Sequence, residues 1–515
     1  MKLKKYKLLV TNLIVLFFTY SITCHADNLN DEQTYLKFAI PVKFDTFDPT
    51  KSINAHTKLT LPLMYEPLVT INAEQSLKPV LAESWLISTD NHSVTITIKK
   101  NHYFSDHTEV TADDVVSSIS RACAPISDVS EELKSLINCD KSHQNQNFKP
   151  SVVAIDKYNV QFNIKSSPAT FLYQLSSPAA VVSKIAASGK LIGSGPYMIA
   201  HNDHSSLTLK KNPFSANDNS AINDGLILSY LNMKITPLSL IEGKFDGALM
   251  YKMDDIYDFK NDKYRLYKIT PNITETLVLN NQKYPFDHAI VRRALSSAIY
   301  NTINCYCIPG AHKAYGFIPY GTGGSIANDS PVFLSIIPPE QVFQSVPELK
   351  RSKITVIIHQ LEDQRNSCLE KQIRSTARPY NIDLKFYYHK NYPELESLYL
   401  HHKLDGFLEL YVFRNREAYS TLRYFSQGGE NNANVKDDTI DTILNHVMST
   451  NTTHGRYQMY RNVNKYIQDQ AIIIPILYMD HGNLLRKCIK GANDNFLFNP
   501  FIHLKQLTKS NMCHL

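Results

Sequence analysis

The residues most able to do chemistry in this chain are a serine between two glycines and a group of cysteines and histidines. Gly193-Ser194-Gly195 has the appearance of a nucleophile loop, but a serine attacks only when a general base lies within reach, and no base is identifiable nearby. The HExxH, P-loop, GxSxG and CxxC patterns are absent from the sequence. We therefore predict a tight turn before Pro196 and Tyr197, and a protein that is not an enzyme.

Cysteine and histidine side chains raise the possibility of a soft-metal site. Cys305, Cys307 and His312 carry suitable ligand atoms, but their spacing is weak evidence of a site. His401 and His402 are adjacent, and adjacent residues of a strand point to opposite faces of the sheet. We predict no metal site and no cofactor.

Alternating and helical patterns indicate the elements that would position a binding site. Residues 35–41 alternate as a strand, and residues 94–98 alternate apolar β-branched residues with threonine. Thr111 can cap a helix through its side-chain oxygen, and the two aspartates at residues 113–114 are favourable at the positive end of the helix dipole. Apolar residues then follow at helical spacing: Val115, Val116, Ile119 and Ala122.

Three more amphipathic helices are predicted in the second half of the chain. They begin at Asp287, at Asp437-Asp438 and near Arg456, and the last one ends near Asp469. The final helix leads into an apolar strand at residues 472–477, in which Pro475 indicates an edge position or a bulge.

The length of 515 residues is large for one hydrophobic core, so we expect at least two lobes. A hydrophobic fraction of 43% and a charged fraction of 20% are typical of an ordered globular protein. Strands and helices interleave along the chain, and no short internal repeat or low-complexity tract interrupts them. The predicted class is mixed α/β.

The first 26 residues have the pattern of a secretory signal peptide. Four lysines precede the apolar run from Leu8 to Phe18, and small residues lead to a predicted cleavage site after Ala26. The alternatives are a permanent membrane anchor or a lipoprotein signal at Cys24. The apolar run is short for a bilayer span, and Thr23 fits a lipoprotein box poorly. We predict a periplasmic protein.

Cleavage after Ala26 would change both the net charge and the number of cysteines. The formal net charge of +6 falls to +2 when the four lysines of the signal are removed, which gives no support for a nucleic-acid partner. Seven of the eight cysteines remain, and export permits disulfides. Cys123 and Cys139 could pair, whereas Cys305 and Cys307 are too close to bridge one another comfortably. At least one cysteine must stay free in a monomer.

A series of motifs resembles the large solute-binding proteins of peptide and nickel importers, called family 5. The order and spacing of these motifs over most of the chain carry the resemblance, because each alone is weak. The motifs are Phe47-Asp48-Pro49, Met64 to Val69, Lys78 to Trp85, Phe104-Ser105-Asp106, Thr111 to Val116, Gly193 to Tyr197, Ile241 to Asp246, Pro285-Phe286-Asp287 and Val291 to Leu295.

The resemblance implies a two-lobed periplasmic binding protein fold with an additional subdomain and a discontinuous first lobe. After the signal peptide at residues 1–26, it divides the chain into lobe I at 27–50, 182–270 and 486–515, a subdomain at 51–181, and lobe II at 271–485. Two crossings near residues 271 and 485 would act as the hinge, and a ligand would be enclosed between the lobes.

The resemblance also implies a ligand-binding segment in residues 405–417. In peptide-binding members, a strand of lobe II offers an aromatic residue and then an aspartate that pairs with the ammonium of the peptide. Tyr411 stands where the family often has tryptophan, and Arg414 stands where the aspartate would be. A guanidinium would repel an ammonium and favour an anion. With a one-residue slip, Glu409 or Glu417 would supply the acid. Without a slip, Arg414 is either a ligand contact or a loop residue that is solvated or paired with Glu417.

The remaining predicted contacts come from both lobes. Tyr65 and Glu66 would lie at the entrance side of lobe I, and Asn280 just beyond the hinge crossing. Lobe II would contribute Tyr411, Phe413, Arg414, Asn415 and Glu417.

We therefore predict a monomeric substrate-binding protein of an ABC importer, with a peptide or peptide-sized ligand and a membrane permease as partners. The alternatives are an enzyme, a periplasmic interaction or sensor protein on the same scaffold, and a binder of a metal-type or haem-type ligand.

Overall fold

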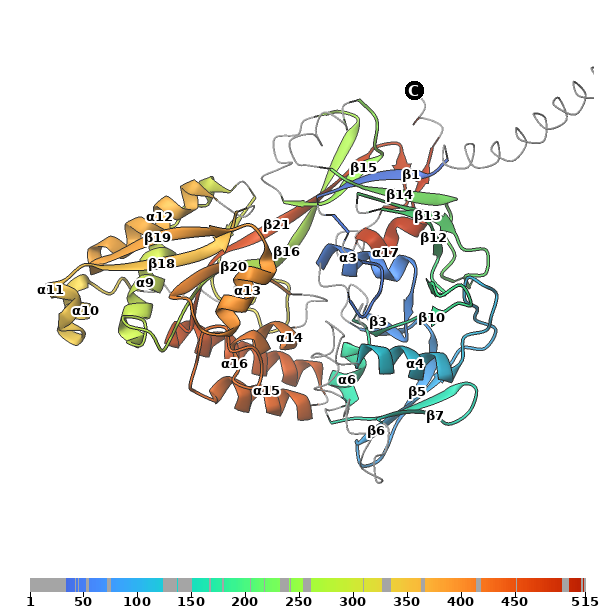
Figure 1. Cartoon of the computed structure of the whole chain (residues 1–515), viewed down its shortest axis with the longest axis horizontal. Coiled ribbons are helices and arrows are strands. Elements are labelled where there is room, and N and C mark those ends of the chain that lie inside the picture. Colours follow the sequence, from blue (N-terminus) through green and yellow to red (C-terminus); the bar gives the residue numbers. More distant parts are fainter. Residues whose placement is uncertain are drawn as a thin grey trace, which may run out of the picture.

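The computed structural model of the chain contains two lobes joined across one large sheet (Figure 1). Within the described part of the chain, no helix has the length and apolar character needed to cross a bilayer. The structure describes residues 34–513 except 42, 45, 52–54, 72–75, 124–136, 138–150, 166–167, 178–179, 204, 217, 232–239, 241, 253–260, 309, 327–334, 363–365, 414–417, 451, 493–499 and 511–512. The predicted signal peptide lies outside the described residues.

The sheet has eleven strands and runs through both lobes. Its order is β12 (Tyr197–Asn202), β13 (Ser206–Lys211), β14 (Gly225–Tyr230), β1 (Leu36–Ile40), β15 (Gly247–Lys252), β21 (Ile473–Arg486), β16 (Tyr264–Leu279), β20 (Gly406–Val412), β18 (Ile354–Leu361) and β19 (Ile382–His389), and β17 (His312–Lys313) pairs with β21 beside this path. The strand predicted at residues 35–41 is confirmed as β1.

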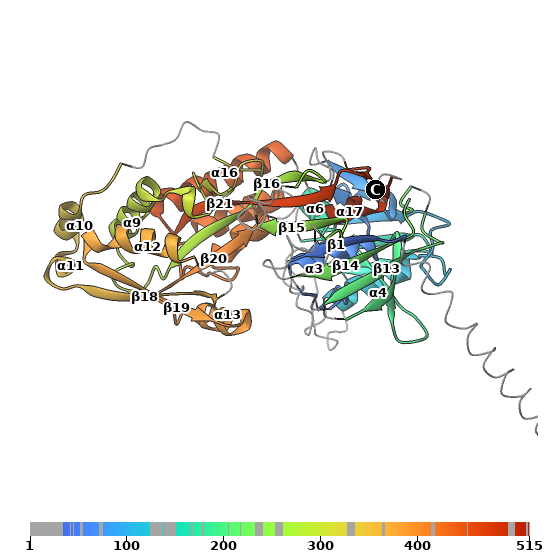
Figure 2. The ribbon, with the colours of Figure 1, turned by 90° about the horizontal axis from the view of Figure 1, so that it is seen from above.

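The long strands β16 and β21 form an antiparallel pair that passes from one lobe to the other (Figures 1 and 2). Residues 264–269 of β16 pair with residues 486–481 of β21, next to β15. Residues 273–278 of β16 pair with residues 479–473, next to β20. The register shifts between Ile269 and Ile273, so the ladder is irregular at the passage between the lobes.

The first lobe packs around a core that draws on distant parts of the sequence. Phe38 of β1, Leu226 of β14 and Leu485 of β21 are buried together. A disulfide between Cys488 and Cys513, with Cα atoms 5.2 Å apart, attaches the C-terminal segment. Smaller elements complete the lobe: α3 (Ala55–Thr60), η1 (Leu61–Leu63), β2 (Glu66–Pro67), β9 (Val181–Val182), β10 (Lys184–Ile185), β11 (Leu191–Ile192), β22 (Ile489–Lys490), α17 (Pro500–His503), η9 (Leu504–Gln506) and β23 (Thr508–Lys509).

A separate core between residues 68 and 182 belongs to a four-stranded sheet covered by a helix. Val94, Ile96 and Ile98 are fully buried, as their alternation predicted. Thr111 and Asp114 form a capping box at the start of the predicted helix. The elements are β3 (Val69–Ile71), β4 (Leu77–Pro79), β5 (Ala82–Ile87), β6 (Ser93–Ile98), α4 (Ala112–Ala122), β7 (Val152–Ala154), β8 (Asn159–Asn163) and α6 (Pro168–Gln174).

The second lobe has a core on each face of its part of the sheet. Ile273, Leu277 and Leu279 of β16 point into one core, whereas Val278 points into the other. Helices α9 (Ala289–Thr302), α10 (Pro339–Ser345), α11 (Pro347–Arg351) and α12 (Ser367–Ala377) contribute to the first core. Helices α13 (Tyr392–Leu400), α14 (Tyr419–Leu422), α15 (Thr439–Ser449) and α16 (Thr453–Gln470) contribute to the second, and short turns η3 (Cys305–Cys307), η5 (Arg378–Tyr380) and η7 (Arg423–Phe425) connect elements of the lobe.

Several local predictions require correction. The N-cap of α9 is His288 rather than Asp287, and α16 begins at Thr453, before the expected Arg456. Pro475 is not on an edge strand, because β21 lies inside the sheet. The ladder skips Ile476 of β21, because the neighbouring residues Glu275 and Thr276 pair with Leu477 and Pro475, so the alternative prediction of a bulge is correct.

We predict that Leu277→Ala lowers the free energy of unfolding by about 2–5 kcal/mol, because Leu277 is fully buried in the core of the second lobe. Leu86→Ala is the matched control, since this leucine is 73% exposed, and it should change stability little. Urea unfolding followed by circular dichroism measures both. Equal losses of stability in the two variants would contradict the core assignment of β16.

Candidate functional site

The structure describes five of the eight residues predicted to contact a ligand: Tyr65, Glu66, Asn280, Tyr411 and Phe413. Arg414, Asn415 and Glu417 lie outside the described residues, in the segment that directly follows β20.

Tyr65 lies in the first lobe with its ring in the core. It is 2% exposed, and its hydroxyl donates a hydrogen bond to the carbonyl of Phe47 at 3.0 Å. Burial, with a smaller contribution from the Asp48 carboxylate, raises the pKa of Tyr65 above its ordinary value. The hydroxyl therefore stays protonated and acts as a donor.

The turn at Gly193 and Gly195 packs directly on this tyrosine. A Cβ at Gly193 would lie 2.0 Å from the carbonyl oxygen of Met64, and the amide of Gly195 donates to the same oxygen at 3.0 Å. Ser194 is fully buried between the two glycines. The glycines are thus explained by close backbone approach, as expected for a turn.

Glu66 belongs to a buried polar network within the first lobe. Its carboxylate contacts Nε2 of His102 at 2.5 Å and accepts a hydrogen bond from Asn219, whose own side-chain oxygen accepts from Lys505. Burial lowers the pKa of Lys505, and the Glu66 carboxylate partly offsets that effect. The network links β2 to the C-terminal part of the chain, and any ligand contact of Glu66 must compete with these partners.

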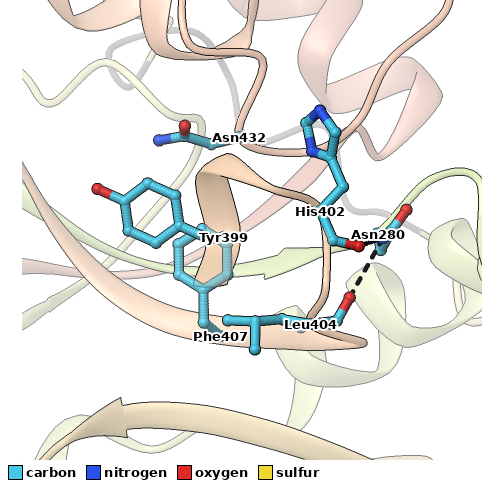
Figure 3. Close-up of a pocket in the computed structure, with 7 residues that line it drawn as sticks. Asn280, Tyr399, His402, Leu404, Phe407 and Asn432 are labelled. Carbon is cyan, nitrogen blue, oxygen red and sulfur yellow. Dashed lines mark hydrogen bonds between the residues drawn. The ribbon is translucent and has the colours of Figure 1, made fainter. Parts of the chain in front are cut away.

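Asn280 follows the end of β16 and supports the backbone of the second lobe. Its side-chain amide donates to the carbonyls of His402 and Leu404, both at 3.2 Å, and its oxygen accepts from Asn434 at 3.0 Å (Figure 3). These bonds fix the turn between α13 and β20. The turn also corrects the prediction for His401 and His402, which do not lie on a strand.

Tyr411 and Phe413 are brought together at the other end of β20. Their rings meet the ring of Phe317 with centroids 5.4 and 5.1 Å apart, and Phe425 contacts the same ring. Burial first, and the Glu409 carboxylate second, raise the pKa of Tyr411 well above its ordinary value. This aromatic cluster fixes the point from which residues 414–417 continue.

The five predicted residues that the structure describes do not all lie together. Leu279 pairs with Gly406, whereas the amide of Phe413 donates to the carbonyl of Asn272. Because Asn280 lies opposite Asp405, Asn280 and Phe413 are separated by eight strand positions, or roughly 26 Å. Tyr65 and Glu66 belong to the other lobe.

A small pocket adjoins Asn280 and encloses about 190 Å³ of space, its open mouth included. Tyr399 and Phe407 stack with centroids 4.8 Å apart along its wall, and His402 and Asn432 face it from the opposite side (Figure 3). Its lining is Asn280, Tyr399, His402, Leu404, Gly406, Phe407 and Asn432. Apart from Asn280, the residues of this lining carry no sequence signal, because the lining depends on the packing of Tyr399 of α13 on Phe407 of β20.

A contact between the lobes was also missed. Arg456 of α16 places its guanidinium over the ring of Tyr173 in α6, 4.6 Å from the ring centroid. Met448 of α15 packs against the core of residues 68–182 as well as against its own lobe. Figure 1 shows α15 and α16 beside α6. The sequence signal available was a cation on the apolar stripe of a helix.

The described residues contain no group of three histidine, cysteine or carboxylate side chains arranged to hold a metal ion. Cys305 is a free thiol, and Cys123 and Cys368 are disulfide-bonded. The suggested partner of Cys123, Cys139, lies outside the described residues.

Comparison with known proteins gives consistent matches. Residues 76–331 match the family described as bacterial extracellular solute-binding proteins, family 5, middle region. A probable D,D-dipeptide-binding periplasmic protein of Escherichia coli is 23% identical over 89% of this chain and 90% of its own length. The glutathione-binding protein of the same organism is 26% identical over 51% of each chain.

Solved structures show the same fold. The E. coli murein tripeptide binding protein has a TM-score of 0.74 at 20% identity, covering 92% of this chain and 98% of its own. NikA from Brucella suis in complex with Fe(III)-EDTA has a TM-score of 0.77 at 16% identity, covering 92% and 100%. DppA from Helicobacter pylori with the peptide STSA scores 0.74 at 17% identity, covering 94% and 100%. The predicted two-lobed α/β fold is confirmed.

We predict that Glu66→Ala lowers the free energy of unfolding by about 2 kcal/mol or more, because it leaves the buried His102 without its carboxylate partner. The control is Glu83→Ala, an exposed glutamate of β5, which should be nearly neutral. Thermal unfolding compares the two. A neutral effect of Glu66→Ala would show that the network contributes nothing to the fold.

Proposed function

Because the chain belongs to the bacterial extracellular solute-binding proteins of family 5, we propose that it captures a peptide or a solute of similar size between its two lobes. Members of this family and fold are substrate-binding proteins of ABC importers rather than enzymes. The partner on the membrane side would be an ABC permease, and the protein would act as a periplasmic monomer.

The observation that carries this proposal is the paired passage of β16 and β21 between the lobes. Two strands are the route by which the large sheet continues from one lobe to the other, and the ladder is irregular between Ile269 and Ile273. A pair of strands with a local irregularity can bend while each lobe keeps its own core. Such an arrangement supports enclosure of a ligand by lobe movement.

The names of the relatives support a peptide-sized ligand. A D,D-dipeptide, glutathione, a murein tripeptide and the peptide STSA are all short peptides or peptide derivatives. Fe(III)-EDTA shows that the same fold also holds a non-peptide anion. Each of these ligands carries at least one carboxylate group, which makes a carboxylate the common chemical feature.

For the ligand contacts, we retain the predicted set. The aromatic cluster of Tyr411 and Phe413 would present Arg414, Asn415 and Glu417 to the ligand, because those residues follow β20 directly. Tyr65 and Glu66 would contribute from the first lobe, where Glu66 must exchange its present partners for the ligand, and Asn280 would act through the turn it supports. The division of the chain at residues 50, 181, 270 and 485 is part of the same proposal.

We expect the radius of gyration to decrease when ligand is added, because the ligand binds both lobes and shifts the population toward the closed form. Small-angle scattering on the mature protein, with and without a panel of di- to pentapeptides, measures this change. Native mass spectrometry of the protein as isolated identifies any retained ligand. Unchanged dimensions across the panel, together with no retained peptide, would reject peptide capture.

The second expectation is a preference for N-acetylated over free-amine peptides, because Arg414 would repel an ammonium. A partly desolvated charge pair contributes on the order of 1–3 kcal/mol, which corresponds to roughly tenfold or more in affinity. Arg414→Asp should reverse the preference in calorimetry on matched peptides. If the unmodified protein prefers the free amine and the substitution leaves that preference unchanged, the role of Arg414 is wrong.

A further inference from the structure

Among the described residues, Arg456 is the most deeply buried arginine or lysine. It lies in the first turn of α16 and is 1% exposed. It occupies a core-facing position, since Tyr460, Val463 and Ile467 continue the same buried stripe of the helix. A charged side chain in such a position requires compensation by hydrogen bonds or by an opposite charge.

That compensation is missing from the described structure. Within the described part of the chain, neither Nη1 nor Nη2 of Arg456 has a hydrogen-bond partner. Stacking on Tyr173 covers only the flat face of the guanidinium. The donors of a guanidinium lie in its plane, so stacking on Tyr173 satisfies none of them, and both Nη atoms are enclosed without a hydrogen-bond partner among the described residues.

Arg292 shows how the same lobe satisfies a buried arginine that is purely structural. Its Nε, Nη1 and Nη2 donate to the carbonyls of Ala471, Phe286 and Gln470 at 3.1, 2.6 and 3.1 Å. Arg292 is 7% exposed, which is less buried than Arg456. A buried arginine of this lobe can therefore have all three of its donor nitrogens satisfied by backbone carbonyls, whereas Nη1 and Nη2 of Arg456 are not satisfied by any described residue.

The dipole of α16 places a second positive potential beside the guanidinium of Arg456. The N-terminal turn of α16 carries the positive end of the dipole of an 18-residue helix. A cation here is unfavourable without an anion, whereas an anion would be attracted by both the dipole and the guanidinium. The contact partner, Tyr173, belongs to α6 on the other side of the boundary between the lobes.

We propose that Arg456 is an anion-binding residue that receives a carboxylate group of the ligand between the lobes. This inference rests on the proposed capture of a ligand between the lobes and specifies its chemistry. The carboxylate would lie against the edge of the guanidinium near the start of α16, while Tyr173 holds the guanidinium plane from the opposite lobe. Arg456 and Tyr173 then act as a specificity-determining pair.

The first test compares peptides that differ only in this group. Native mass spectrometry and calorimetry use a library of N-acetylated tri- to pentapeptides with a free C-terminal carboxylate, and the same library as C-terminal amides. The unmodified protein should bind the acid form at least about tenfold more tightly. In Arg456→Gln the two forms should bind within about twofold of each other. Arg461→Gln is the matched control, because Arg461 lies on the same helix but donates to Ser325 within its own lobe.

The second test does not depend on peptide capture. Melting temperatures are measured with N-acetylglycine and with its neutral amide at constant ionic strength. N-acetylglycine should raise the melting temperature of the unmodified protein and of Arg461→Gln by roughly 1–2 °C, and that of Arg456→Gln should not change. Because each variant is compared with itself under the two ligands, a loss of stability in Arg456→Gln does not obscure the result.

The outcomes separate the two proposals. If no peptide of either form binds but N-acetylglycine stabilises through Arg456, peptide capture is rejected and the anion site stands. If peptides bind and the acid-to-amide ratio is the same in Arg456→Gln as in the unmodified protein, Arg456 is a packing contact only and the inference is overturned. The inference is also overturned if N-acetylglycine and its amide shift the melting temperature of the unmodified protein equally.

Discussion

The antiparallel pairing of β16 with β21 is the interaction on which the rest of the molecule depends. One half of this pair is hydrogen-bonded to β15 and packs on the core of the first lobe. The other half is hydrogen-bonded to β20 and packs on the two cores of the second lobe. Without this pair the sheet would divide into two, because β21 and β16 are the strands that stand between β15 and β20 in its order. The irregular register between Ile269 and Ile273 interrupts the ladder where the lobes meet, and a locally weakened ladder is the natural place for bending.

This pair also positions the chemistry of the second lobe. Thr274 of β16 donates to the carbonyl of Phe317 at 2.8 Å, and Tyr478 of β21 donates to the carbonyl of Gly316 at 2.9 Å. Both strands therefore hold the segment that carries Phe317 against the sheet. Phe317 in turn packs on Tyr411 and Phe413, so the end of β20 is fixed by polar contacts from two strands and by aromatic contacts on top. Residues 414–417 leave from this fixed point.

Local patterns predicted much of the fold, and long-range packing explains what they missed. The alternation of Val94, Ile96 and Ile98 and the cap at Thr111 depend on neighbouring residues, and both were correct. The sequence did not predict the length of β16. Thr274 and Thr276 are buried in a polar and aromatic layer, so this strand lacks the alternation of exposed polar and buried apolar residues that predicts a strand. Asn280 was predicted just beyond the hinge crossing, but residues 271–279 of β16 separate it from that crossing, and it supports the turn at Leu404.

In the candidate site, the sequence also did not predict which charged residues are buried. Glu66 and Arg456 are both buried, but the sequence around them differs little from that of exposed charges. Glu66 is explained by His102 and Asn219, which lie 36 and 153 residues away along the chain. Arg456 meets Tyr173 across the boundary between the lobes. Only the folded chain brings such partners together, so burial of a charge cannot be inferred from its own surroundings in the sequence.

A cation at the boundary between two lobes couples binding to movement. When the lobes separate, water can solvate the guanidinium of Arg456; when they approach, Tyr173 covers its face and that hydration is lost. Closure without an anion therefore carries a desolvation cost that is absent from an apolar interface. An anion that bridges to the guanidinium removes much of this cost only in the closed form, because the enclosed pair is shielded from water. Such a ligand has a differential affinity for the closed form, which is the condition for shifting the population. A neutral ligand of equal size would lack this contribution, so the same residue links the selection of the ligand to the closing of the lobes.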